Sequence, residues 1–142
     1  MLRRSLVLAS VAAVLCAGTA SAATVKFHAD LTAAAEVPPS KSTGSGVAEM
    51  SLDTVTHELS WDVTFKGFSS DVVAAHIHGP AQPGQNAGVV IPFPKNPTSP
   101  LHGSAKLTEE EQNQIMAGAY YVNVHTRNNP SGAVRGQLVV VK

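Results

Sequence analysis

The chain has 142 residues, and its ten Lys and Arg side chains are balanced by ten Asp and Glu side chains. The balanced charge gives no sign of the basic face that a nucleic-acid-binding protein needs, so we expect no nucleic-acid partner. The one cysteine, Cys16, lies in an N-terminal segment that we expect to be removed. The rest of the chain then has no thiol for a disulfide, a nucleophile or a thiolate metal ligand.

Residues 1–22 have the three parts of a secretory signal peptide. Arg3 and Arg4 form the charged start, residues 5–18 are mostly apolar, and the small residues of "ASA" form a cleavage site. We therefore expect a mature chain that begins at Ala23, is periplasmic or secreted, and has no membrane segment after cleavage. About 120 residues remain, enough for one domain with a hydrophobic core, residues 23–142.

The remaining sequence predicts an all-β domain with one short helix. Short runs rich in β-branched and aromatic residues alternate with Gly, Pro, Ser and Asn, which is typical of an antiparallel sandwich or barrel. A helix is expected near residues 108–117, where Thr108 and Glu111 can form a capping box and Gly118 supplies the stop. The expected strands lie near residues 24–31, 46–53, 57–67, 72–78, 88–93, 103–107, 119–126 and 133–141.

The stretch "AAHIHGP" ends one of these strands with two histidines, His76 and His78. Side chains alternate along a strand, so these two histidines share the outer face while Ile77 points to the core. The following segment, residues 79–100, carries six prolines and three glycines. We expect most of it to be loop, and a long loop at this position can form the wall of a site.

The same alternation applies to the last two strands. In residues 119–126, Tyr120, Val122 and Val124 form the core set, which leaves Tyr121, Asn123 and His125 on the outer face. In residues 133–141, Val134, Leu138 and Val140 continue the core set, which leaves Arg135 and Gln137 outside.

A hairpin joins these two strands through "RNNPSG", where Pro130 and Gly132 fit positions two and four of a type I turn. Placing Val122 opposite Leu138 puts His125 opposite Arg135, and Asn123 opposite Gln137. His125 and Arg135 are then expected to be neighbours.

Two histidines at i and i+2 lie roughly 6.6 Å apart along a strand, a span that a metal ion can bridge if the strand end bends. His125 from a neighbouring strand would complete a three-nitrogen site. Imidazole ligands without carboxylate or thiolate favour copper first and zinc second. Asn123 and Gln137 could orient these histidine ligands by donating hydrogen bonds to them. The alternative is that all of these are ordinary polar strand residues. We expect His28, His57 and His102 to be ordinary surface residues.

Several stretches together resemble the CHRD domain family, first described in the extracellular protein chordin and also found as single domains in exported bacterial proteins. The resemblance extends from about Leu31 to Val140, and Ala133 departs from it where the family often has an acidic residue. The matching stretches are "AAEVPPS", "AAHIHGPA", "NAGVVIPF", "GAYYVNVHT" and "SGAVRGQL".

A more distant similarity is to copper/zinc superoxide dismutase. It implies a Greek-key β-sandwich of superoxide dismutase-like or immunoglobulin-like type. It also implies copper ligands at His76, His78 and His125, and an anion-guiding role for Arg135. The sequence departs from that enzyme family in lacking a zinc loop, a bridging histidine and disulfide cysteines.

Two functions compete on this basis. The first is an exported copper-binding protein, with superoxide dismutase-like activity on a small anion or a role in copper handling. The second is a non-catalytic extracellular module that binds a protein partner and in which the histidines are structural. Hydrolysis has little support, because the sequence has no G-x-S-x-G nucleophile motif.

Overall fold

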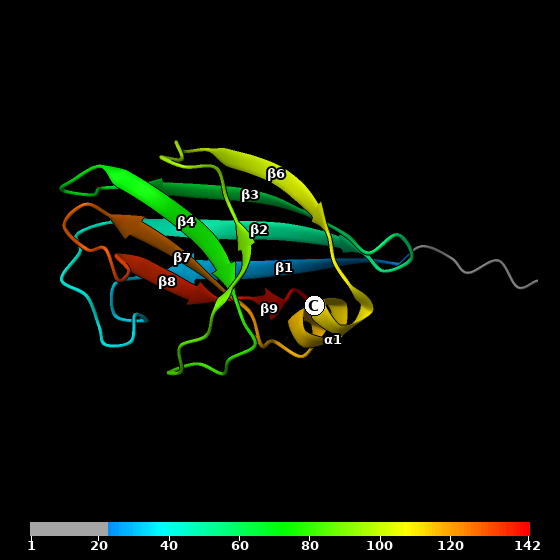
Figure 1. Ribbon diagram of the computed structural model, residues 1–142. Helices are drawn as coiled ribbons and strands as arrows, with labels where there is room; N and C mark the ends of the chain where they lie inside the picture. Colours follow the sequence, from blue (N-terminus) through cyan, green and yellow to red (C-terminus); the bar gives the residue numbers. More distant parts are fainter. Residues whose placement is uncertain (1–22) are drawn as a thin grey trace, which may run out of the picture.

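The computed structural model describes residues 23–142 as two packed antiparallel sheets with one short helix (Figure 1). The expected signal peptide, residues 1–22, lies outside the described residues and stays a prediction. The first sheet has the strand order β6-β3-β2-β1-β9, and the second has the order β5-β4-β7-β8. The elements are β1 (Thr24–Leu31), β2 (Ser45–Asp53), β3 (Glu58–Lys66), β4 (Val72–His78), β5 (Val89–Pro92), β6 (Leu101–Lys106), α1 (Glu109–Met116), β7 (Tyr121–Thr126), β8 (Val134–Gln137) and β9 (Val139–Val140).

The predicted all-β Greek-key sandwich is confirmed. Strand β5 pairs with β4, the chain then crosses to the other sheet as β6, and β7 returns to lie beside β4, which makes a Greek-key connection across the two sheets. Alternation along each strand sends one set of side chains into the space between the sheets. In β3, for example, Leu59, Trp61 and Val63 are buried and the intervening residues are exposed.

The helix begins and ends as the sequence predicts. The Thr108 hydroxyl accepts a hydrogen bond from the Glu111 amide at 3.2 Å, and the Glu111 carboxylate accepts one from the Thr108 amide at 2.7 Å. Gly118 follows the last turn with a φ of 74°, a conformation that glycine adopts without strain. Ile115 is the fully buried helical residue and fixes the helix against the sandwich core.

The segment expected as one last strand is divided between the two sheets. β8 pairs with β7, whereas β9 pairs with β1 through Phe27 and His28. Leu138 is fully buried at the crossing, and its amide donates to the Tyr120 carbonyl at 2.9 Å. The prediction that Val140 belongs to the core was wrong, because the chain has by then moved to a sheet edge where Val140 is 40% exposed.

Candidate metal site

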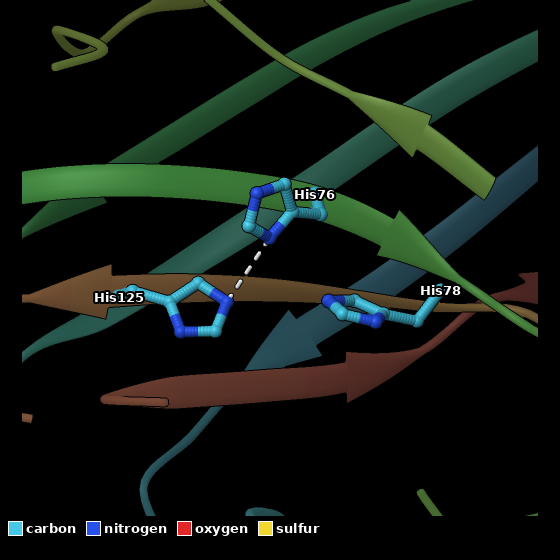
Figure 2. Close-up of side chains that lie close together, drawn as sticks. All are labelled: His76, His78 and His125. Atoms are coloured by element: carbon cyan, nitrogen blue, oxygen red, sulfur yellow. Dashed lines mark hydrogen bonds between the residues drawn. The ribbon is translucent and has the colours of Figure 1, made fainter. Parts of the chain in front are cut away.

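Three histidines converge on the outer face of the β5-β4-β7-β8 sheet. His76 and His78 project from β4 and His125 from β7, and Figure 2 shows the three imidazole rings turned toward one another. One ring nitrogen from each histidine can be chosen so that all three lie within 4.8 Å of one another. The predicted convergence of the three side chains is therefore confirmed as geometry.

The pairing of β4 with β7 explains the convergence. Asn123 lies opposite His76, and Ala74 lies opposite His125. His125 thus approaches His76 diagonally, across a position where the small Ala74 side chain leaves room. Nδ1 of His76 and Nε2 of His125 are 3.1 Å apart.

Hydrogen bonds to backbone carbonyls set the orientation of two rings. Nδ1 of His78 lies 3.1 Å from the Ala87 carbonyl, and Nδ1 of His125 lies 2.9 Å from the Pro130 carbonyl. A carbonyl only accepts, so each Nδ1 carries the proton and each Nε2 presents a lone pair. Nε2 of His125 then accepts from Nδ1 of His76. Nε2 of His78 is buried and has no hydrogen-bond partner among residues 23–142.

The environment keeps the three imidazoles neutral. Burial, and to a smaller extent the neighbouring His125 and His78, lower the pKa of His76 to about 4. Burial also lowers the pKa of His78 and of His125, although the bonds to the Ala87 and Pro130 carbonyls oppose this. Neutral imidazole is the form that binds metal ions.

The residues present fit a first-row metal ion. Metal–imidazole bonds of 2.0–2.1 Å place tetrahedral ligand nitrogens about 3.3 Å apart. The His76–His125 pair already has this spacing, so the remaining adjustment is an inward movement of His78. The buried, unpaired Nε2 of His78 is the donor that such an ion would satisfy.

The long loop after β4 lies against this site, as expected. The Ala87 carbonyl accepts from His78 and, at 3.3 Å, from the Tyr121 hydroxyl, while the Ala87 amide donates to the same hydroxyl at 3.1 Å. These bonds place the loop over the outer face of the sheet. Tyr121 and Arg135 are consequently buried, although they point away from the sandwich core.

The predicted register of the β7–β8 hairpin was wrong by two residues. Asn123 lies opposite Arg135, and Tyr121 lies opposite Gln137. The Pro130 turn itself forms as expected, because the Gly132 amide donates to the Asn129 carbonyl at 3.2 Å. A further turn, closed by hydrogen bonds between Thr126 and Asn129, lengthens the connection and shifts the pairing. An even shift keeps each side chain on its predicted face.

Arg135 is therefore not the neighbour of His125 that the sequence predicted. Its guanidinium lies over the Tyr121 ring, 3.4 Å from the centroid, and His78 stacks on the same ring at 4.9 Å. Its Nη2 donates to the Gln85 carbonyl at 2.7 Å, and its Nη1 to the Asn86 side chain at 3.1 Å. These two hydrogen bonds hold the loop, and only 2% of Arg135 is exposed. The predicted role of Arg135 as an anion guide stays a prediction.

The two amides predicted to support the ligands make contacts with other parts of the chain. Gln137 donates to the Ala81 and Gly118 carbonyls, both at 2.8 Å. Asn123 donates to the Val134 carbonyl at 3.2 Å and to the Glu36 carboxylate. Both side chains thus tie segments together around the site, and their supporting role for a bound metal stays a prediction.

Glu36 was missed from sequence, and its carboxyl group packs against the outer face of β7 and β8. Glu36 is 7% exposed, and burial raises its pKa to about 7, although the Asn123 bond and the nearby Arg135 lower it. The signal was present in "AAEVPPS", where a single acidic residue stands among apolar ones.

The other three histidines lie away from the cluster. Nδ1 of His28 is 2.6 Å from Glu49, and Nδ1 of His102 is 3.3 Å from Asp62; both histidines are on the other sheet. Their side chains are 36% and 62% exposed, as expected for surface residues. His57 is half-buried in the turn before β3.

The chain is thus a β-sandwich domain with a histidine cluster on the outer face of one sheet. A family model described as the CHRD domain matches residues 27–138, and the chain belongs to this family, as the sequence motifs predicted. CHRD domains occur in extracellular proteins. Neither the curated proteins nor the solved structures give a significant match to this sequence. Within residues 23–142, no helix has the length and apolar character needed to cross a membrane.

Proposed function

We propose that this protein is an exported copper-binding domain in which His76, His78 and His125 supply the ligands. The observation that carries the proposal is the buried Nε2 of His78, which has no hydrogen-bond partner among residues 23–142 and lies in a cluster of three neutral imidazoles. An acceptor buried without a partner costs free energy, and a bound cation would remove that cost. Export rests on the predicted signal peptide and on the extracellular occurrence of the family.

Copper is preferred to zinc because of the donor set. The cluster offers three imidazole nitrogens and contains no carboxylate or thiolate. Copper(II) forms the most stable complexes of the divalent first-row ions with such ligands, and zinc(II) follows as the second choice. His76 donates to His125, so binding a metal through both of these nitrogens requires the shared proton to leave.

The geometry supports copper binding or handling better than superoxide dismutation. An anion guide must present a free guanidinium beside an open metal position. The Arg135 guanidinium is buried against Tyr121 and occupied by Gln85 and Asn86. We therefore propose copper binding alone, and a dismutase assay of the copper-loaded protein tests directly whether it also dismutes superoxide.

The test is titration of the purified protein with copper(II) and zinc(II), followed by calorimetry and by electron paramagnetic resonance for copper. We expect one equivalent of copper with nitrogen hyperfine structure from imidazole. His125→Ala should weaken binding by at least about tenfold, since it removes one of three ligands. His102→Ala is the matched control, because this exposed histidine lies on the other sheet. If His125→Ala binds copper as tightly as the parent, the proposed ligand set is wrong.

A second candidate function is supported by the hydrogen bonds of the same rings. His78 and His125 each bond to a carbonyl in a loop, and His76 bonds to His125, so the cluster ties two loops to the sheet without any metal. This favours a non-catalytic module that binds a protein partner. In that case copper would leave the melting temperature unchanged, whereas His125→Ala would lower it in the absence of metal.

A further inference from the structure

A pocket of about 290 Å³ lies between the segment after β1 and the turn that joins β7 to β8. One wall contains Glu36 and Pro38, and the other contains Asn128, Pro130 and Gly132. This volume is close to the lower end of the range for small-molecule sites. None of the three histidines lines this pocket, so binding in it does not depend on a bound metal.

The Glu36 carboxylate is built into this pocket. Its Oε1 accepts a hydrogen bond from the Asn123 amide. Its Oε2 lies against Gly132, where an added Cβ would come within 2.5 Å of that oxygen. Gly132 also has a φ of 141°, a conformation that residues with a side chain rarely adopt. Both this conformation and the close approach of Oε2 favour glycine at position 132, so no side chain fills this wall of the pocket. No hydrogen bond to Oε2 is present among residues 23–142.

The charge of the pocket is complementary to a single cation. Glu36 is the one ionisable residue that lines it, and the other lining residues are Val, Pro, Ser, Asn and Gly. Arg135 lies near enough to affect the pKa of Glu36, but the two form no ion pair within 4.0 Å among residues 23–142. A carboxylate that is 7% exposed and lacks an ionic partner is costly, and either a proton or a cationic ligand can compensate its charge.

Neutral polar groups and proline rings surround this carboxylate. Many nearby carbonyls are already used: the Asn129 carbonyl accepts from Thr126 and Gly132, the Pro130 carbonyl from His125, and the Val37 carbonyl from Asn86. A ligand therefore finds one strong acceptor, Oε2, within walls that suit an alkyl chain. This pattern fits a primary ammonium group with a short apolar stem.

We propose that this pocket binds the ammonium group of an alkylamine, with Glu36 Oε2 accepting its hydrogen bond. The same chemistry is offered by a free small amine and by a lysine side chain of a partner protein.

The test uses n-butylammonium and, as a neutral probe of the same length, n-butanol, with nitrogen–proton NMR spectra of the labelled protein. We expect saturable shifts of the Gly132, Ser131 and Asn129 amides with the ammonium, and weaker or no shifts with butanol. Glu36→Gln should lower the affinity about tenfold to a hundredfold, because it replaces a charge-assisted hydrogen bond with a neutral one. Its spectrum outside the pocket reports whether the variant is folded.

Two controls make the result decisive. Glu58→Gln removes an exposed carboxylate on the other sheet and should leave the affinity unchanged. N-acetyl-lysine methylamide carries the same ammonium on a peptide unit. Binding at least as tight as that of butylammonium would support a lysine side chain as the source, and much weaker binding would identify a free amine. Equal shifts with butanol and butylammonium, or full binding by folded Glu36→Gln protein, would overturn the proposal.

Discussion

The substitution Glu36→Gln is expected to make the stability of the protein less dependent on pH. Burial raises the pKa of the Glu36 carboxyl from 4.5 to about 7. A carboxyl that holds its proton more tightly in the folded state contributes stability below pH 4.5, and this contribution is lost as the pH rises through 7. Glutamine has the same shape, stays neutral and can still accept the hydrogen bond from Asn123.

The size of the effect follows from the pKa change. One pKa unit corresponds to about 1.4 kcal/mol, so the Glu36 change sets an upper limit of about 3 kcal/mol. The variant should therefore match the parent near pH 4.5 and exceed its free energy of unfolding by up to about 3 kcal/mol near pH 8.5. Because 7% of Glu36 is exposed, little of this effect is lost to solvent screening.

The assay is urea unfolding of both proteins across this pH range, followed by circular dichroism. The difference between the two curves cancels every titrating group that they share. Glu58→Gln, at an exposed carboxylate, should give a difference that barely changes with pH. A constant difference between parent and Glu36→Gln would show that the buried carboxyl does not carry the expected penalty and would refute the reasoning.

Three further predictions concern the loop after β4, Gly103 on the edge strand β6, and the cap of the helix. Arg135→Met should remove the hydrogen bonds to Gln85 and Asn86 and destabilise the protein by about 2 kcal/mol. It should also speed hydrogen exchange at the Ala87 amide, and unchanged exchange would mean that the guanidinium does not hold the loop. Gly103→Ala should cost about 1–3 kcal/mol and shift the fluorescence of Trp61, since the new Cβ would lie 2.6 Å from the indole; unaltered emission and melting temperature would contradict this contact. Thr108→Ala should lower the free energy of unfolding by about 1 kcal/mol through loss of the helix cap, whereas Thr56→Ala, in an exposed turn, should have a smaller effect.

The faces of the strands could be predicted from sequence because alternation is a local property. Ile77, Val122 and Val124 reach the core, and His76, His78 and His125 share the opposite face. The convergence of the histidines required only that β4 and β7 be neighbours. The hairpin register could not be derived in the same way, because it depends on the length of the connecting turns, and the extra turn at Thr126 leaves no periodic signal.

Loops explain most of what the sequence did not reveal. Arg135, Asn123 and Tyr121 were correctly assigned to the outer face, yet the loop after β4 and the segment around Glu36 cover them. Glu36 belongs to a connection without periodicity, and its burial depends on segments that are almost a hundred residues further along the chain. The division of the last strand at Leu138 was missed because its hydrophobic pattern continues without a break.

The meeting of the two ends of the domain has a consequence for synthesis. Arg135 and Thr32 exchange two backbone hydrogen bonds of 3.0 Å, and β9 completes the edge of β1. The backbone groups of Thr32 and of the outer edge of β1 therefore stay unpaired until β8 and β9 have been synthesised. Such long-range closure slows folding, and the sandwich stays incomplete until β8 and β9 have left the ribosome.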